Sequence, residues 1–243
     1  MRRLWMSLLL VPVMVVGLAS AAWASPTAPA ARTAAVARTQ VASARALQPG
    51  MKGAKVKALQ RRLAALKYYP GAIDGHFGTS TLEAVWAFYE VQRLKPHNYV
   101  SAAMKRALAH PRAPRVLVKH GGANRIEVNL SREVLVLYHN NHVELISHVS
   151  TGGHYYYCSN GGCAVAITPT GNFKTVVFMP GWVQVPLGEM FNPVFFIGTA
   201  FAIHGDTDVP LAPVSHGCVR IPMDIAAFFH KLVHIPGEPV YIR

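Results

Sequence analysis

The spacing of apolar residues changes along this chain, from a helical period before residue 110 to the two-residue period of strands after residue 114. Before the change, apolar residues recur every three or four positions, as on one face of a helix. After it, stretches such as Arg125 to Leu130 alternate apolar and polar side chains. His110 to Pro114 contains two prolines, which interrupt regular structure. We therefore expect a small helical domain, a short linker and a mainly β domain.

Three short helices are expected between residues 47 and 110. The first has four apolar residues at helical spacing and ends before Pro70 and Gly71. Ser80 to Glu83 has the pattern of a capping box, which predicts that the second helix starts there. Ser101 is expected to cap the third helix, which ends near His110. The apolar positions of the first helix are Val56, Leu59, Leu63 and Leu66.

The region after the linker is expected to contain several strands and one substantial helix, Met223 to Leu232. Asn140 and Asn141 are expected to form a hairpin turn between two of the strands. Many strands at this spacing predict a β-sandwich or an open barrel. The predicted strands are 125–130, 133–139, 142–150, 173–178, 201–204 and 239–242.

The first 24 residues have the three regions of a secretory signal peptide. Two arginines precede an apolar run over residues 8–18, and Ala22-Trp23-Ala24 provides small residues for a cleavage site. Cleavage is expected after Ala24, which predicts export. A retained segment would instead be a membrane anchor, because it is nearly long enough to span a bilayer. Residues 25–46 are rich in Ala, Thr, Arg and Pro, and we expect a disordered tether.

The chain carries a formal charge of +13, which favours anionic partners. No basic stripe with interleaved aromatic residues and no nucleic-acid motif is present in the sequence, so nucleic acid is not expected as a partner. Wall polymers and anionic lipid headgroups are the alternatives for an exported chain. The net charge of the chain therefore gives information about its location and does not indicate which reaction it catalyses.

A cysteine, a histidine and flexible small residues occur close together near the C-terminus. Cys218 lies in Ser215-His216-Gly217-Cys218-Val219-Arg220, shortly after the pair His204-Gly205. A thiol attacks a carbonyl as its thiolate, so it needs a base such as imidazole, and His204 is the candidate. The carbonyl of Gly205 is expected to accept from the His204 ring and orient it.

The residues before Cys218 are candidates for binding the substrate. Backbone N–H groups around Ser215, His216 and Gly217 can stabilise an oxyanion, and Arg220 can bind a substrate carboxylate. Alternatives remain open: His216 packs or orients its neighbours, and Arg220 forms a structural ion pair. The alternative for Cys218 is a small buried hydrophobic residue or half of a disulfide, and the alternative for His204 is a core histidine hydrogen-bonded to the backbone. No metal is expected, because the histidines show no HExxH spacing and a thiol supplies the nucleophile.

The other two cysteines, Cys158 and Cys163, flank a short flexible turn. We expect them to pair as a disulfide that shapes a loop, since an exported chain meets an oxidising environment. Two free thiols are the alternative. The neighbouring residues Tyr155 to Tyr157 either contact a substrate or pack at a strand end.

The order of these motifs resembles that of the L,D-transpeptidases, whose YkuD-type catalytic domain remodels bacterial peptidoglycan. Besides His204-Gly205 and Ser215 to Arg220, the segments Ser150-Thr151-Gly152 and Thr168 to Phe173 match the family, and the likeness covers about residues 115 to 243. The resemblance implies that Cys218 attacks a tetrapeptide stem, releases D-alanine and holds the stem as a thioester without a cofactor. It also implies that carbapenems acylate Cys218.

The helical region is similar to the peptidoglycan-binding domain 1 family. Gly53 to Gln60, Asp74 to Gly78 and Thr81 to Phe88 match its three motifs. The resemblance implies binding of peptidoglycan, with Asp74 and Phe77 as candidate contacts; a turn role for Asp74 and a core role for Phe77 are the alternatives.

Together these inferences divide the chain and give its expected activity. The divisions are a signal peptide (1–24), a tether (25–46), a helical peptidoglycan-binding domain (47–110), a linker (111–115) and a catalytic domain (116–243). The expected protein is a secreted L,D-transpeptidase of the cell wall or periplasmic space, acting on stem peptides and glycan. The alternatives are an L,D-carboxypeptidase that uses the same acyl-enzyme and a wall-binding protein without catalysis.

Overall fold

The computed structural model describes residues 46–159 and 161–243. The signal peptide expected at 1–24 lies outside the described residues, as does the expected tether except for Ala46. Among the described residues, no helix is both long enough and apolar enough to span a membrane.

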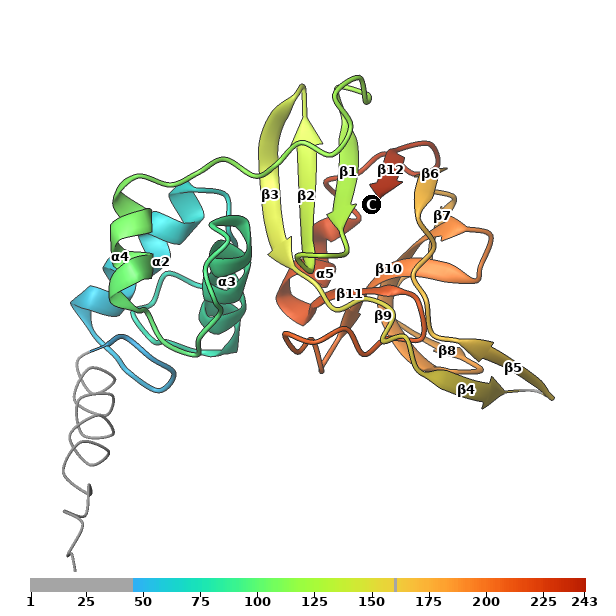
Figure 1. The fold of residues 1–243 in the computed structure, drawn as a ribbon, viewed down its shortest axis with the longest axis horizontal. Coiled ribbons are helices and arrows are strands. Elements are labelled where there is room, and N and C mark those ends of the chain that lie inside the picture. The colour runs from blue at the N-terminus through green and yellow to red at the C-terminus, as the bar shows by residue number, and fades with distance from the viewer. Residues whose placement is uncertain (1–45, 160) are drawn as a thin grey trace, which may run out of the picture. The chain divides into compact units, whose positions relative to one another are not determined.

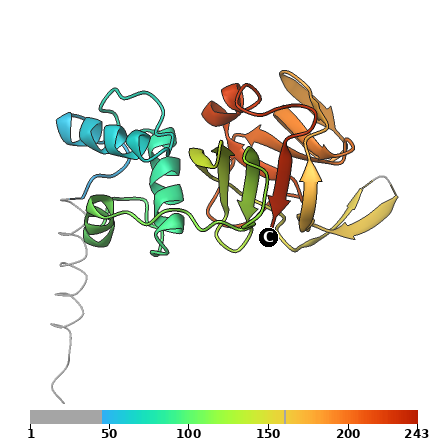
Figure 2. The same cartoon turned by 90° about the horizontal axis from the view of Figure 1, so that it is seen from above.

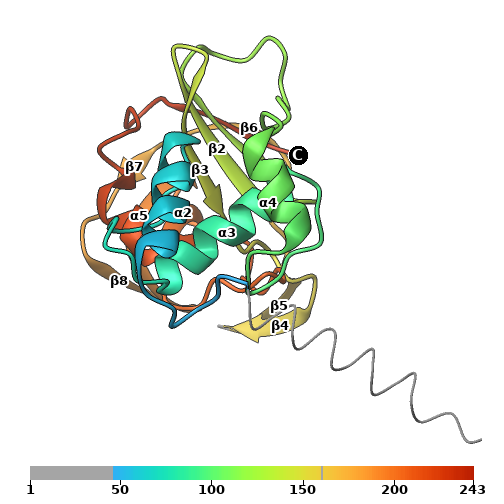
Figure 3. The same ribbon diagram turned by 90° about the vertical axis from the view of Figure 1, so that its left-hand side faces the viewer.

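Three helices form the N-terminal part of the fold: α2 (Ala54–Ala65), α3 (Thr79–Val91) and α4 (Ala102–Ala109) (Figures 1 and 3). The Ser101 hydroxyl accepts a hydrogen bond from the Met104 N–H at 3.1 Å, so it caps α4 as predicted. The helical region expected from the apolar spacing is therefore confirmed.

The capping box expected at Ser80 to Glu83 was wrong. Helix α3 begins after Gly78, which has an extended backbone and makes no side-chain cap. Ser80 lies inside the first turn, and its hydroxyl bonds to the carboxylate of Asp224 in helix α5 (Met223–Phe229). A tertiary contact uses the hydroxyl that the local pattern assigned to a cap.

The remainder of the fold is mainly β, as predicted, and has two five-stranded sheets and a hairpin (Figures 1 and 2). The first sheet has the order β3-β2-β1-β12-β6, and the second has the order β11-β10-β9-β7 with β8 paired to β9. Strands β4 and β5 form the separate hairpin. The bounds are β1 Arg125–Asn129, β2 Val134–His139, β3 His142–His148, β4 Tyr156–Ser159, β5 Gly162–Val165, β6 Gly171–Lys174, β7 Val177–Phe178, β8 Trp182–Val185, β9 Gly188–Ile197, β10 Phe201–Asp206, β11 Val219–Pro222 and β12 Pro239–Ile242.

One apolar core lies between the two sheets. The first sheet contributes Val128 and Leu137, the second contributes Ile203 and Ile221, and α5 contributes Phe229, all buried in the same cluster. Two sheets that share a core in this way form a sandwich.

The predicted strand at 173–178 was wrong in its extent. The segment divides into β6 and β7, which belong to different sheets, so the chain crosses the sandwich between Lys174 and Val177.

Strands β8, β9 and β11 were not predicted. Within β9, Asn192 has a φ of 48° and Pro193 follows it, and both weaken the alternating pattern that indicates a strand. Helix α5 ends at Phe229, three residues before the predicted Leu232.

Strand β2 is buried on both faces. Leu135 and Leu137 point into the core between the sheets, while Val134, Val136 and Tyr138 belong to the core of the helical part. That second core also contains Ile146 of β3, together with apolar residues of α2, α3 and α4. The helical part and the first sheet therefore share one hydrophobic core, although a proline-containing segment joins them in sequence.

Candidate active site

Strands β10 and β11 bring the expected nucleophile and base together. The two strands are parallel, with Ile203 paired to Val219 and His204 paired to Arg220. Side chains alternate between faces along a strand, so position 218 shares the face of Arg220, and paired positions in neighbouring strands share a face. Cys218 and His204 therefore lie on the same face of adjacent strands.

A cavity of about 630 Å³ opens at this face. His204, Cys218 and Arg220 line it together with Ser215 and His216. The remaining wall comes from three segments: the β4–β5 hairpin, the β8–β9 turn and the residues that precede β10. These lining residues are Tyr157, Ser159, Gly162, Cys163, Ala164, Val185, Pro186, Leu187, Gly188, Glu189, Met190, Thr199, Ala200 and Phe201, with Asp206 at the end of β10.

The ring of His204 has a fixed orientation. Its Nδ1 lies 2.9 Å from the carbonyl oxygen of Gly205, which accepts a hydrogen bond from the ring and so assigns the proton to Nδ1. The other nitrogen, Nε2, then carries the lone pair and can accept a proton. The pairing of β10 with β9 shifts between Ile203 and Gly205, a β-bulge of the kind that reorients a side chain.

Burial favours the neutral forms of both groups before a substrate binds. It lowers the pKa of His204, although the Gly205 carbonyl and Asp206 act in the opposite direction. It raises the pKa of the Cys218 thiol, which the Ala202 N–H and Arg220 lower by less. The structure thus favours a neutral thiol beside a neutral imidazole.

Gly205 lies within β10 and has no room for a side chain. A Cβ at this position would be 2.6 Å from the Cβ of Ala226 in α5, and Phe191 and Met223 are also close. Gly205 continues strand β10. Glycine is needed here for the close approach of β10 to α5.

The turn before Cys218 is held by the hydroxyl of Ser215. This hydroxyl accepts from the Gly217 N–H at 3.0 Å and donates to the Cys218 carbonyl at 2.6 Å. Gly217 has a φ of 135°, and a Cβ there would be 2.7 Å from Phe201. Because the Gly217 N–H already has a partner, the expected role of this amide in an oxyanion site does not agree with the structure.

Two further motifs hold the same turn in place through hydrogen bonds. The hydroxyl of Thr168 donates to the Gly217 carbonyl at 2.8 Å and accepts from the Gly152 N–H at 2.8 Å. The Ser215 N–H donates to the Thr151 carbonyl at 2.9 Å. The sequence motifs at 150–152 and 168–173 were recognised, but their supporting roles were not assigned from sequence.

Arg220 is occupied by carboxylates of the chain itself. Its Nε lies 3.1 Å from Asp206 Oδ2, and its Nη1 lies 3.9 Å from Asp208 Oδ2. The expected carboxylate-binding role therefore gives way to the ion-pair alternative in this structure. Asp206 was not identified from sequence, because its contact depends on the register of β10 and β11.

His216 packs against tyrosines of the β4 region. Its ring is 4.8 Å from the ring of Tyr157 and 5.4 Å from that of Tyr155, with edge-on geometry in both cases. Burial and the nearby Arg220 lower its pKa. The packing role weighed for His216 agrees with these contacts.

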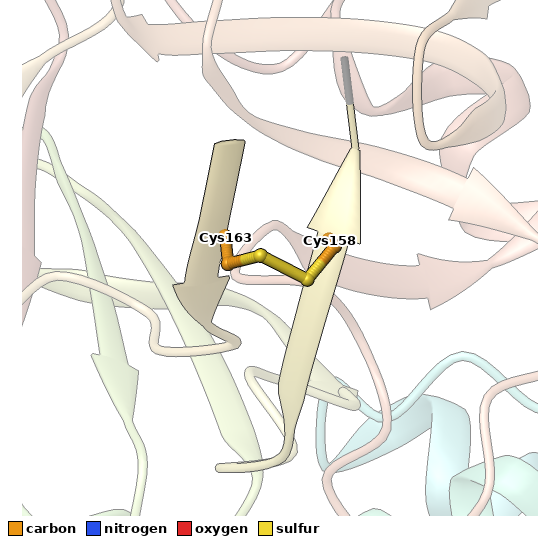
Figure 4. Close-up of a disulfide and its surroundings, with 2 residues drawn as sticks. All are labelled: Cys158 and Cys163. Atoms are coloured by element: carbon orange, nitrogen blue, oxygen red, sulfur yellow. A yellow bond between two sulfur atoms is a disulfide. The ribbon is translucent and has the colours of Figure 1, made fainter. Parts of the chain in front are cut away.

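Cys158 and Cys163 are joined by a disulfide across β4 and β5 (Figure 4). Their Cα atoms are 4.0 Å apart, and the two residues are direct cross-strand partners. Since Cys163 lines the cavity, the disulfide fixes part of the cavity wall.

The two candidate peptidoglycan contacts in the helical part have structural roles. Phe77 is 1% exposed and lies in the core, so its side chain is not available to a ligand. Asp74 Oδ1 accepts from the His76 N–H at 2.8 Å and from Gln60 Nε2 at 3.0 Å. These hydrogen bonds lower the Asp74 pKa and fix the turn. In the described ranges, no group of three or more His, Cys, Asp or Glu side chains is arranged to hold a metal ion.

Comparisons with known proteins agree with this architecture. Residues 123–242 match the family model of the L,D-transpeptidase catalytic domain (YkuD), and residues 52–108 match the model of a peptidoglycan-binding domain (PG_binding_1). The chain is similar to the crystal structure of an L,D-transpeptidase from Xylanimonas cellulosilytica, at 29% identity and a TM-score of 0.76. That comparison covers 82% of this chain and 97% of the other.

Two other solved structures are more distantly similar. An L,D-transpeptidase from Stackebrandtia nassauensis is 19% identical with a TM-score of 0.46, over 81% of this chain and 94% of the other. The L,D-transpeptidase LdtMt1 in complex with imipenem is 20% identical with a TM-score of 0.42, over 51% and 60%. The search of curated proteins found no match. The two family matches and the similarity to the Xylanimonas structure show that this chain carries an L,D-transpeptidase catalytic domain at residues 123–242, with a peptidoglycan-binding domain at residues 52–108 before it.

Proposed function

We propose that the chain forms peptidoglycan cross-links through a thioester on Cys218. One observation carries the proposal: Cys218 and His204 share one face of adjacent strands and one cavity, and the Gly205 carbonyl holds the Nδ1 proton of His204. This arrangement leaves a base nitrogen for the thiol proton, which is what a thiol nucleophile needs.

The first half of the reaction transfers a stem peptide to the enzyme. His204 Nε2 takes the thiol proton as Cys218 Sγ attacks the carbonyl carbon of the third stem residue, giving a tetrahedral oxyanion. The backbone amides of His216 and Cys218 are the proposed donors to this oxyanion, since the Gly217 amide is bonded to Ser215. When the peptide C–N bond breaks, the imidazolium gives its proton to the amine of the leaving D-alanine, and a thioester remains.

The second half releases the stem to an acceptor. An amine of another stem attacks the thioester carbonyl, and His204 takes its proton. The C–S bond then breaks, and the proton passes to the sulfur, which restores the starting enzyme. Water in place of the amine would give a carboxypeptidase.

The proposed location is the cell wall or periplasmic space. The signal-like residues 1–24 and a disulfide between Cys158 and Cys163 support export, because structural disulfides belong to oxidising compartments. Stem peptides and glycan are the proposed partners, with the helical part binding the glycan.

The test combines an adduct measurement with product analysis. The purified chain is incubated with imipenem, and intact mass is measured with Cys218→Ala as the control. We expect one adduct on the wild type and none on the variant. An unmodified wild-type chain under reducing conditions would leave a wall-binding protein as the better description.

Product analysis then separates the two enzymatic outcomes. Digested peptidoglycan treated with the enzyme is examined by mass spectrometry. Cross-linked dimers with loss of D-alanine support transpeptidation, whereas shortened stems without dimers identify a carboxypeptidase.

A further inference from the structure

His148, at the end of β3, contacts both the helical part and the loop that carries the nucleophile. Its Nδ1 lies 3.0 Å and 3.1 Å from the two carboxylate oxygens of Glu90 in α3. Its Nε2 lies 3.1 Å from the carbonyl oxygens of both Val209 and Pro210. These two residues belong to the catalytic loop, which we define as residues 207–218 between β10 and β11.

Both ring nitrogens of His148 face hydrogen-bond acceptors in a buried site. The exposed fraction of the side chain is 0% for His148 and 7% for Glu90. An imidazolium satisfies all these acceptors, because both of its nitrogens donate. If Glu90 instead holds the shared proton, Nε2–H still donates to the loop carbonyls. The contact with the catalytic loop therefore persists as long as the pair keeps its shared proton.

Several groups surround the pair and affect its charge. Burial raises the pKa of Glu90 to about 7, while His148 and Arg132 favour its ionised form. The pKa of His148 is raised because Glu90 and the loop carbonyls together outweigh the cost of burial. The carboxyl groups of Glu83 and Glu133 also favour the charged imidazole, and the Trp86 ring packs edge-on against it at 5.4 Å.

We infer that the Glu90–His148 pair is a positioning element of the active site, through which the helical part holds the catalytic loop in place for Cys218. Neither side chain lines the reaction cavity, so the pair acts through Val209 and Pro210. This inference rests on the proposed function for its kinetic consequence, and it assigns the helical part a role in catalysis besides binding.

The shared proton makes this positioning dependent on pH. Once the pair loses that proton, the neutral ring keeps a single N–H, and the carboxylate of Glu90 is a stronger acceptor than a backbone carbonyl. The N–H then faces Glu90, and the lone pair of Nε2 faces Val209 and Pro210. Since the pKa of His148 is raised, the loop contact is present below this pKa and is lost as pH rises through it.

The first experiment removes the pair without leaving a buried charge. The double variant Glu90→Met/His148→Leu replaces it with apolar side chains of similar size, a change that is often neutral or stabilising for the fold. We expect a similar unfolding temperature but acylation by imipenem at least about tenfold slower, since a 1 Å misplacement can cost about 10²-fold. The double variant Lys67→Ala/Glu144→Ala is the matched control, because this exposed ion pair crosses the same junction at 3.4 Å without touching the catalytic loop.

Hydrogen exchange of residues 207–214 tests the inference without any reaction at Cys218. We expect faster deuterium uptake in this segment for the apolar variant and unchanged uptake for the control. Unchanged uptake in both variants would overturn the inference, whether or not the wild type reacts with imipenem. A wild type that fails to react bears on the proposed function alone.

The variant Glu90→Gln tests the pH dependence. Its amide can donate to the ring Nδ1, which leaves Nε2–H on the loop carbonyls without a shared proton. We expect the acylation rate of the wild type to fall on the alkaline side of its profile and that of the variant to keep rising. Superimposable pH profiles would reject the role of the shared proton.

Discussion

The hydroxyl of Thr168 donates to the Gly217 carbonyl directly before Cys218, the proposed nucleophile, at a distance of 2.8 Å. The same oxygen accepts from the Gly152 N–H at 2.8 Å, and the Thr168 residue is 2% exposed. One buried hydroxyl thus joins the two supporting motifs to the catalytic turn.

Replacing this hydroxyl with a methyl group tests the connection. Thr168→Val leaves the Gly217 carbonyl and the Gly152 N–H buried without a partner, which costs about 1–3 kcal/mol of unfolding free energy. We expect slower acylation of Cys218 by imipenem as well, because the turn is no longer held. Urea denaturation and intact mass against time measure the two effects. Thr168→Ser keeps the hydroxyl and is expected to resemble the wild type; a loss in Thr168→Ser with Thr168→Val unchanged would assign the effect to the methyl group and contradict the role of the hydroxyl.

The neutral resting state of the catalytic pair predicts a particular pH profile. Burial lowers the pKa of His204, so the base stays unprotonated at neutral pH and is lost only as pH falls through a value below 6.5. Burial raises the pKa of Cys218, so alkylation by iodoacetamide should keep increasing to a higher pH than for a free cysteine. Alkylation rates measured between pH 5 and 10 give the acidic and the alkaline side of this pH profile. A thiolate plateau already present at pH 6 would contradict the neutral pair.

Gly205 should not tolerate a side chain. Gly205→Ala places a Cβ 2.6 Å from Ala226, and such overpacking costs about 1–3 kcal/mol. We also expect lower activity, because β10 carries His204. Chemical denaturation with a parallel imipenem assay gives both quantities. For comparison, Gly162→Ala in β5 meets its nearest atom at 3.9 Å and should leave stability nearly unchanged.

The disulfide of the β4–β5 hairpin should affect substrate binding more than stability. Cys158 and Cys163 are five positions apart, and a loop this short contributes less than the ~3 kcal/mol given by a 15-residue loop. For Cys158→Ser/Cys163→Ser we expect a small decrease in unfolding temperature and a higher KM for stem peptides, since Cys163 lines the cavity. Steady-state kinetics with stem peptides measure kcat and KM for the variant and the wild type. A fall in kcat with KM unchanged would place the hairpin in the chemical step instead.

Phe77 is expected to contribute to stability and not to ligand contact. Phe77→Ala removes a side chain that is 1% exposed, which costs about 3–5 kcal/mol in a core. Its core includes Val134 and Val136 of β2, so we expect helical and sheet signals to be lost in one transition at a lower temperature. Circular dichroism and tryptophan fluorescence follow the two parts. Weaker peptidoglycan binding at full stability would restore the ligand role.

The sequence was most informative where function depends on residues close together in the chain. The segment from Ser215 to Arg220 places the thiol on its turn, and the His204–Gly205 contact joins adjacent residues. Both depend on local geometry, so a motif was enough to indicate them. The Ser101 cap was predictable for the same reason, because its bond to Met104 spans three residues.

Contacts between distant segments were not predictable in this way. Arg220 meets Asp206 only because β10 and β11 pair in a particular register. Glu90 and His148 are 58 positions apart, and each belongs to an element whose own pattern gives no sign of a buried partner. Ser80 fitted a local capping pattern, but its hydroxyl was taken by Asp224, 144 positions away.

The hydrophobic core shared by the helical part and strands β2 and β3 has a consequence for how far the enzyme can work. Because this core packs the two parts against each other, a glycan strand bound by the helices, as proposed above, would stay at one distance from the sulfur of Cys218. Cross-links would then form only between stem peptides close to the bound glycan strand. The enzyme would have to dissociate from that strand before it could cross-link another region. Release from the wall would then set the range of the enzyme.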